Sequence, residues 1–134
     1  MLFNPVGCWK DGDPRTLVIA EESRPHISNP TSNSCNFLHG PYKTRKDPIE
    51  NCYKTAKCKK RKIFALQDGG QCFISGPNQP KTAHEKYNRS TACGVDGKGG
   101  PLANEVYEIK PGSILIFNTV IYVLIFLSFN HRCS

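Results

Sequence analysis

The chain has 134 residues and a formal net charge of +7, nearly all of it carried before residue 111. This length argues against more than one folded domain, and the core that it can bury is modest. The basic charge favours acidic partners and leaves anionic glycans, phospholipid headgroups and nucleic acid open. The seven cysteines include no CxxC pair, which argues against zinc ribbons and fingers, so no metal and no cofactor is expected.

The N-terminal part is predicted to contain a short strand and a long loop. The opening MLFNPVGCWKDGD is not a signal peptide, because Asn4 and Pro5 break its short apolar start. Residues 16–20 (TLVIA) favour a strand. The Pro-, Ser- and Asn-rich residues 21–34 favour a loop.

A helix is predicted from Asp47 onward. Asp47 suits the N-cap and Pro48 the first helical position, while Glu50 places an acid in the first turn. The helix is expected to end within residues 57–62. Its apolar face recurs at helical spacing and consists of Ile49, Cys52, Tyr53 and Ala56.

The second half is predicted to be mostly strand. KIFALQ (62–67) and QCFIS (71–75) favour two strands joined by a DGG turn, which is a hairpin signal. Residues 81–87 favour a helical turn, and residues 103–110 alternate as a closing strand. One helix over a small antiparallel sheet makes this an α+β module, placed at residues 6–110.

Six cysteines are dispersed through this module, as in a disulfide framework. Cys52 lies on the apolar face of the helix and Cys72 begins the second hairpin strand, so a bridge between them would staple the helix to the sheet. It would close a loop of about 20 residues and contribute roughly 3 kcal/mol. Reduced, buried thiols at these two positions are the alternative. Cys8 and Cys93 could tie the two ends of the module together. The remaining candidates, as a third pair or as single thiols, are Cys35 and Cys58.

Residues 113–129 (SILIFNTVIYVLIFLSF) form an uncharged apolar run. As a helix the run would span about 25 Å, so we expect a C-terminal hydrophobic helix that crosses a membrane once. A buried element and a GPI signal are the weaker alternatives. Because disulfides do not persist in the cytosol, the module is expected outside the cell, which implies a partial or misjoined sequence.

Several motifs occur in an order that is similar to WSC domains. GCWKD followed by RTL resembles their opening, ENCYKTA resembles their helix, and FALQDGGQCF resembles their hairpin. DGKGGPLANEVYEI stands where these domains end in a strand. The resemblance, to WSC-like, apple-like modules of invertebrate mosaic and matrix proteins, covers about residues 6–109, with fewer cysteines than is typical. It implies a secreted or cell-surface module that binds carbohydrate without catalysis.

Aromatic and planar polar side chains are the candidates for ligand contact, since aromatic faces pack against the apolar surfaces of sugars. Ordinary packing is the alternative for each of them. The aromatic candidates are Trp9, Tyr42, Tyr87 and Tyr107, of which Trp9 and Tyr107 are preferred. The polar candidates are Arg15, Gln67 and Gln71.

Other patterns bear on partners and chemistry. KCKKRK (57–62) lacks any accompanying nucleic-acid-binding motif, so a solvated helix end is preferred and no nucleic-acid partner is expected. On an extracellular module this run could contact sulfated glycans. Asn88 begins an NRS sequon for N-glycosylation. No catalytic pattern joins the histidines, so no enzyme activity is expected. They are His26, His39, His84 and His131.

The preferred interpretation is a disulfide-stapled recognition module, secreted or at the cell surface, that binds glycan or extracellular matrix. Residues 113–129 would hold it to a membrane. The alternatives are a structural or protein-interaction module without sugar affinity, a fragment of a larger secreted mosaic protein, and a cytosolic tail-anchored basic protein.

Overall fold

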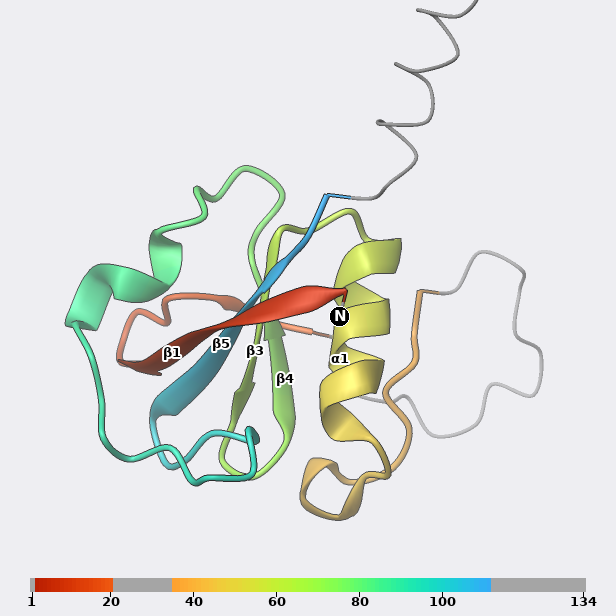
Figure 1. The fold of residues 1–134 in the computed structure, drawn as a ribbon, viewed down its shortest axis with the longest axis horizontal. Helices are drawn as coiled ribbons and strands as arrows, with labels where there is room; N and C mark the ends of the chain where they lie inside the picture. Colours follow the sequence, from red (N-terminus) through yellow and green to blue (C-terminus); the bar gives the residue numbers. More distant parts are fainter. Residues whose placement is uncertain (1, 21–34, 112–134) are drawn as a thin grey trace, which may run out of the picture.

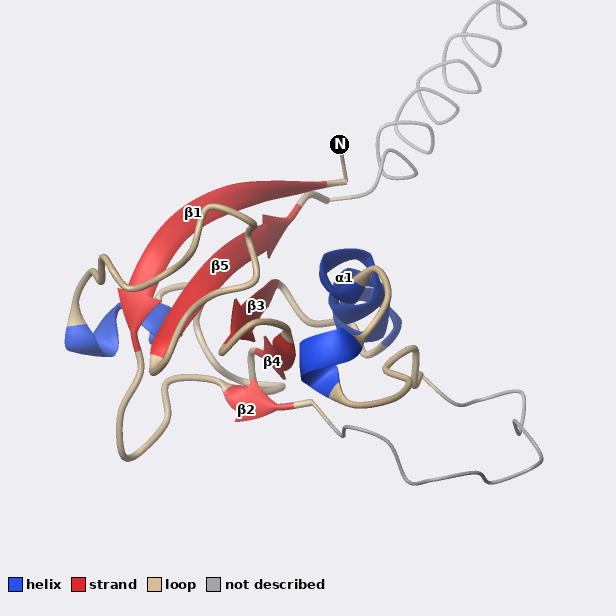
Figure 2. Cartoon of the chain, turned by 90° about the horizontal axis from the view of Figure 1, so that it is seen from below, coloured by secondary structure: helices blue, strands red, loops and turns tan. Residues whose placement is uncertain are grey.

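A computed structural model of the chain describes residues 2–20 and 35–111. Within these ranges, an antiparallel five-stranded sheet in the order β1-β5-β3-β4-β2 carries one α-helix, α1, against β3 and β4 (Figures 1 and 2). The strands are β1 (Phe3–Lys10), β2 (Val18–Ile19), β3 (Ile63–Gln67), β4 (Gln71–Ile74) and β5 (Ala103–Ile109). The helices are α1 (Pro48–Cys58) and two short 3-10 helices, η1 (Tyr42–Thr44) and η2 (Ala83–Tyr87). The α+β class is confirmed.

The helix and the hairpin lie where the sequence predicts them. Pro48 opens α1, and the helix ends at Cys58, inside the expected interval. Asp47 occupies the N-cap position, but its carboxylate makes no capping hydrogen bond, contrary to the prediction. The reason is its left-handed backbone (φ 48°), which differs from the extended conformation that normally aims an N-cap side chain at the first turn.

The sheet has a core on each face, because side chains alternate between faces along a strand. The core on the helix side is formed by the predicted face of α1 together with apolar residues of the central strands, including Phe64, Cys72 and Tyr107. The second core lies on the opposite face, where η2 packs against β1. It is formed by Leu17, Ile63, Ala65, Phe73 and Val106, with Val6, Trp9 and Ala83 packed against them.

The N-terminal strand β1 was not predicted. Because β1 begins at Phe3, the folded module starts three residues before the expected boundary at residue 6. Pro5 was read as an interruption, but β1 is an edge strand with a register shift between Pro5 and Gly7, where a missing N–H is tolerated. The predicted closing strand is confirmed as β5, and it lies between β1 and β3 in the sheet. An edge strand is harder to predict from sequence, because it tolerates residues such as proline that a strand paired on both sides excludes.

The predicted strand at residues 16–20 shortens to Val18–Ile19. The backbone N–H of Thr16 bonds to the Asp11 carboxylate at 2.9 Å and is not part of the sheet ladder. Because of this contact, the beginning of the segment forms a loop. The loop is part of the site described below.

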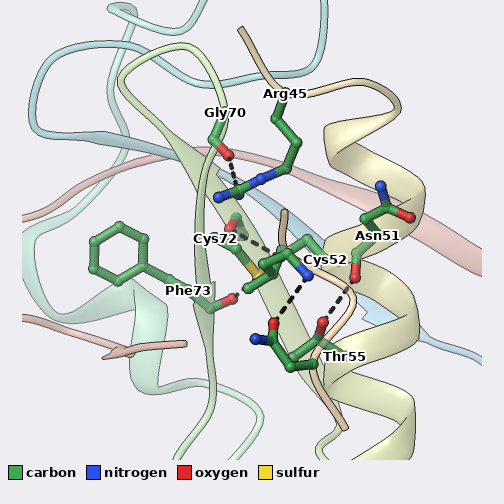
Figure 3. The surroundings of a disulfide bond; sticks show 10 residues. Arg45, Asn51, Cys52, Thr55, Gly70, Cys72 and Phe73 are labelled. Carbon is green, nitrogen blue, oxygen red and sulfur yellow. Dashed lines mark hydrogen bonds between the residues drawn. A yellow bond between two sulfur atoms is a disulfide. The ribbon is translucent and has the colours of Figure 1, made fainter. Parts of the chain in front are cut away.

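Three disulfides hold these elements together, and they have the expected pairings. Cys52–Cys72 joins α1 to β4 with 5.5 Å between the Cα atoms, which confirms the staple over the reduced alternative (Figure 3). Cys8–Cys93 joins β1 to the segment before β5, across 85 residues of sequence. The third bridge ties the end of α1 to the segment that precedes η1. It links Cys35 and Cys58.

Two expectations concern residues outside the described ranges. They are the long loop at 21–34 and the membrane helix at 113–129. In the part of the chain that the structure describes, no helix has the length and apolar character needed to cross a bilayer.

Candidate functional site

Most of the preferred ligand residues lie on the face of the sheet that is turned away from α1. Gln67 and Gln71 are direct cross-strand partners at the turn end of the hairpin, and so share a face. Arg15 lies over Phe73 on this same face, with its guanidinium carbon 5.1 Å from the ring centroid. Trp9 packs against the core of this face as well. The structure therefore gathers four of the five preferred residues on one side.

Arg15 is the centre of a polar network. Its Nη1 donates hydrogen bonds to Asp11 Oδ2 at 3.1 Å and to Gln67 Oε1 at 3.0 Å. Asp11 Oδ1 accepts from the backbone N–H and the hydroxyl of Thr16. The Asp11 side chain is fully buried, whereas 42% of the Arg15 side chain is exposed. A buried carboxylate thus orients a solvent-facing guanidinium, whose Nε and Nη2 make no hydrogen bond within the described residues.

The network continues inward to Asn104, which is fully buried on β5. Its Nδ2 donates to the Thr16 hydroxyl at 3.3 Å, while its Oδ1 has no hydrogen-bond partner among the described residues. Asn104 is also the register partner of Trp9 in the β1–β5 ladder. The polar network and the tryptophan are consequently neighbours.

The loop that carries Arg15 is fixed from two sides. Gln79 Nε2 donates to the Thr16 carbonyl at 3.1 Å, and the Tyr87 hydroxyl donates to the Pro14 carbonyl at 2.7 Å. These contacts keep Arg15 in place over the sheet. A site whose side chains are already ordered loses little conformational entropy when a ligand binds.

The three tyrosine candidates all use their hydroxyls inside the protein. Tyr87 does so as described, and Tyr42 donates to Asp68 Oδ2 at 2.6 Å. Tyr107 lies on the helix-side face, stacks on Phe64 and donates to the Gly97 carbonyl at 2.9 Å. Burial and then the nearby acidic side chains raise the pKa of Tyr107 to about 12. Tyr107 is therefore placed apart from the other preferred residues, and its role in the structure is packing.

Trp9 belongs to an aromatic and cationic cluster at the side of η2. The Arg89 guanidinium lies 4.6 Å from the centroid of its ring, and the His84 ring meets it edge-on at 5.0 Å. Sugar stacking on the ring face that Arg89 covers would require Arg89 to move. Trp9 Nε1 and both ring nitrogens of His84 are buried without a hydrogen-bond partner among the described residues.

Burial lowers the pKa of His84 below its ordinary value of 6.5, against the opposing effects of Glu85, the Lys81 backbone and Glu108. The folded protein thus favours the neutral ring, while the unfolded chain protonates near the ordinary value. Stability is full above that value and is lost as the pH falls below it toward the pKa of the folded state. We expect the melting temperature to decrease between about pH 7 and pH 5.

Substitution H84F should remove the part of this decrease that His84 causes, because the phenyl ring keeps an aromatic contact with Trp9 and cannot be protonated. The matched control is H39Q, since His39 is exposed and packs against no core. Thermal melts across this pH range test the expectation. An unchanged pH slope in H84F, with the fold intact, would contradict it.

One cluster of cysteine and acidic side chains in the described residues was considered as a metal site, and it has no free thiolate to bind a metal. Cys8, Cys93 and Glu105 lie close together, but the two sulfur atoms are bonded to each other. Burial raises the pKa of Glu105, with a further contribution from Asp96.

Several residues of the site were not singled out from the sequence. Asp11 and Thr16 form a local pair whose only sequence signal is an acid five positions before a threonine, and this is common in loops. Asn104 and His84 reach the site through the β1–β5 pairing and the packing of η2 on β1. Neither relation is visible before the sheet order is known. No protein-family model matches the chain, and none of the curated proteins matches it.

Proposed function

We propose that the protein is a non-catalytic extracellular recognition module that binds carbohydrate through the Arg15 face of its sheet. We define this Arg15 face as the exposed Arg15 and the half-buried Gln71, with the buried Gln67 supporting Arg15 and Trp9 at the border. The observation that carries the proposal is the exposed Arg15 guanidinium, which a buried Asp11 carboxylate and a glutamine amide hold in place.

The chemistry of this face suits sugar hydroxyls. Guanidinium and amide groups are planar and offer several donors and acceptors at fixed angles, as neighbouring hydroxyls of a pyranose do. Trp9 is half-buried and supplies the apolar surface that an aromatic side chain presents to a sugar ring, on the ring face that Arg89 does not cover. Phe73 is fully buried beneath Arg15 and supports the guanidinium from below. An ordered polar array beside aromatic surface supports glycan recognition over binding of an extended apolar partner.

The three disulfides support an oxidising compartment, and therefore secretion or display at the cell surface. Asn88 is exposed at the end of η2, where a glycan could be attached if the chain enters the secretory pathway. Tethering to a membrane through residues 113–129 is part of the same proposal. It rests on the sequence of that segment alone.

A glycan array probed with the full chain in neutral detergent is the first test, followed by calorimetric titration of any sugar that binds. Substitution R15A should weaken binding about tenfold or more, since a hydrogen bond to a charged group contributes about 1.5–3 kcal/mol. Q71A should weaken it less, because its amide is neutral. Y107F is the matched control and should bind like the wild type, because Tyr107 faces the helix.

Two outcomes would count against the carbohydrate proposal. Absence of binding to every sugar class would favour a protein-interaction module. Equal loss of affinity in R15A and Y107F would show that the Arg15 face is not the contact surface. Melting temperatures of all variants are measured alongside, so that loss of the fold is not mistaken for loss of contacts.

A further inference from the structure

Five lysines gather where three parts of the chain meet at one end of the module. Lys57 lies in the last turn of α1, and the chain runs from there directly into β3. β5 ends beside this connection, as the hydrogen bond from the Ile109 N–H to the Lys62 carbonyl at 2.9 Å shows. Figure 1 shows the end of β5 on the same side of the module as the end of α1. We define the basic end as Lys57, Lys59, Lys60, Lys62 and Lys110.

The lysines of the basic end have no acidic partner within the described residues. Three other exposed lysines do have one: Lys43 pairs with Asp68, Lys54 with Glu50, and Lys81 with Glu108. Lys10, Lys46 and Lys86 also have none among the described residues, but they are scattered, and what distinguishes the basic end is that its five lysines are close together. A helix dipole accounts for lysines in the last turn of α1. It does not account for Lys62 and Lys110, which adjoin strands. The positive charge at this end is therefore concentrated and uncompensated.

The backbone beneath these side chains is firmly held. The Cys35–Cys58 disulfide fixes the end of α1, and the Arg61 guanidinium donates to the Ser75 carbonyl at 2.9 Å. The Lys110 N–H donates to the Leu2 carbonyl, which fixes the end of β5. Several cations at fixed relative positions attract an extended polyanion more effectively than the same cations on a mobile tail, because less entropy is lost on binding.

We propose that the basic end binds sulfated polysaccharide, at a second site separate from the Arg15 face. This inference rests on the extracellular placement in the proposed function, but not on binding of neutral sugar. Among extended polyanions, sulfated glycans are the ones that an extracellular module meets. Anionic phospholipid is concentrated in the cytoplasmic leaflet, on the other side of the membrane from a disulfide-bonded module.

The test measures binding of the full chain, in neutral detergent, to heparin and to desulfated heparin over a range of salt concentrations. The patch variant combines K60Q, K62Q and K110Q. The control variant combines K10Q, K46Q and K86Q, which removes the same charge from exposed positions away from the basic end. We expect the patch variant to bind heparin about tenfold or more weakly, with a salt slope shallower by roughly two, because ionic contacts release counterions.

The control variant should change the affinity less than about twofold, and desulfated heparin should bind more weakly than heparin. Equal weakening in both variants, or no heparin binding near physiological salt, would overturn the proposal. Binding to phosphatidylserine vesicles without binding to heparin would overturn it in favour of a lipid surface.

A second measurement needs no variant. Acetylation of the wild-type protein, with and without heparin, should show protection of the five lysines of the basic end and none of Lys10 or Lys86. Uniform protection would contradict the site. Because neutral-sugar binding is measured with R15A, failure at the basic end and failure of the Arg15 face are distinguishable.

Discussion

Replacing Cys52 and Cys72 together by alanine is expected to lower the free energy of unfolding by about 4 kcal/mol. The bridge closes a loop of 20 residues, which corresponds to about 3 kcal/mol of chain entropy in the unfolded state. Both sulfur atoms also lie in fully buried residues between helix and sheet, so their removal leaves a small cavity that adds about 1 kcal/mol. For a domain of this size, the melting temperature should fall by about 15–20 °C.

The Cys35–Cys58 pair provides a matched control, because it closes a loop of similar length, 23 residues, and Cys58 is exposed. Replacing this pair by alanine should remove the chain-entropy contribution to the free energy of unfolding without leaving a comparable cavity. Hydrogen exchange distinguishes the two variants further. Amides of α1 should lose protection mainly in the variant that lacks the Cys52–Cys72 staple, and similar exchange in both would contradict its role in docking α1.

Replacing Cys8 and Cys93 by serine should have the larger entropic effect. The loop closed by this bridge spans 85 residues, which corresponds to about 4.5 kcal/mol. The bridge also holds the edge strand β1, whose ladder partner is β5. Urea denaturation should show a lower midpoint together with a larger m-value, because the unfolded chain without the cross-link exposes more surface.

The m-value separates this explanation from a local effect on β1. If the bridge acted only by holding β1 in the folded state, stability would fall while the m-value stayed constant. A loss of less than about 1 kcal/mol in the free energy of unfolding, whether or not the m-value changes, would contradict the large chain-entropy effect expected for this loop. Non-reducing electrophoresis confirms that the other two bridges remain in the variant.

Local signals were sufficient for much of the fold. The Pro48 start, the apolar face of α1 and the DGG hairpin turn are each encoded within a few residues, and each was found in place. The pairing of Cys52 with Cys72 followed from these, because a helix must cover the hairpin of a small sheet. Contacts that depend on neighbours in sequence can be predicted in this way.

The position of β5 and the composition of the site depend on contacts between distant residues. Nothing near Ala103–Ile109 indicates that β1 pairs with this strand, so its place within the sheet was not predicted. Arg15 and Gln67 were both candidates, but the buried Asp11 between Arg15 and the Thr16 amide was not. Tyr107 was a candidate by residue type alone, and strand alternation places it on the other face.

The two proposed surfaces differ in charge and in position. The Arg15 face contains a guanidinium that a carboxylate balances, together with neutral amides, which suits neutral hydroxyl-rich sugars. The basic end contains lysines without acidic partners in the described part of the chain, which suits sulfate groups. A module with both surfaces would recognise the shape of a sugar on one side and the charge of a polymer on the other.

The most direct test of the secreted-module account is mass spectrometry of non-reduced peptides. The protein is produced natively, and its free thiols are blocked before digestion. Three cross-linked peptide pairs should be recovered, joining positions 52 with 72, 8 with 93 and 35 with 58. Recovery of Cys52 or Cys72 in the blocked, reduced form would mean that the helix is held to the sheet by packing alone, and the case for an oxidising compartment would be lost.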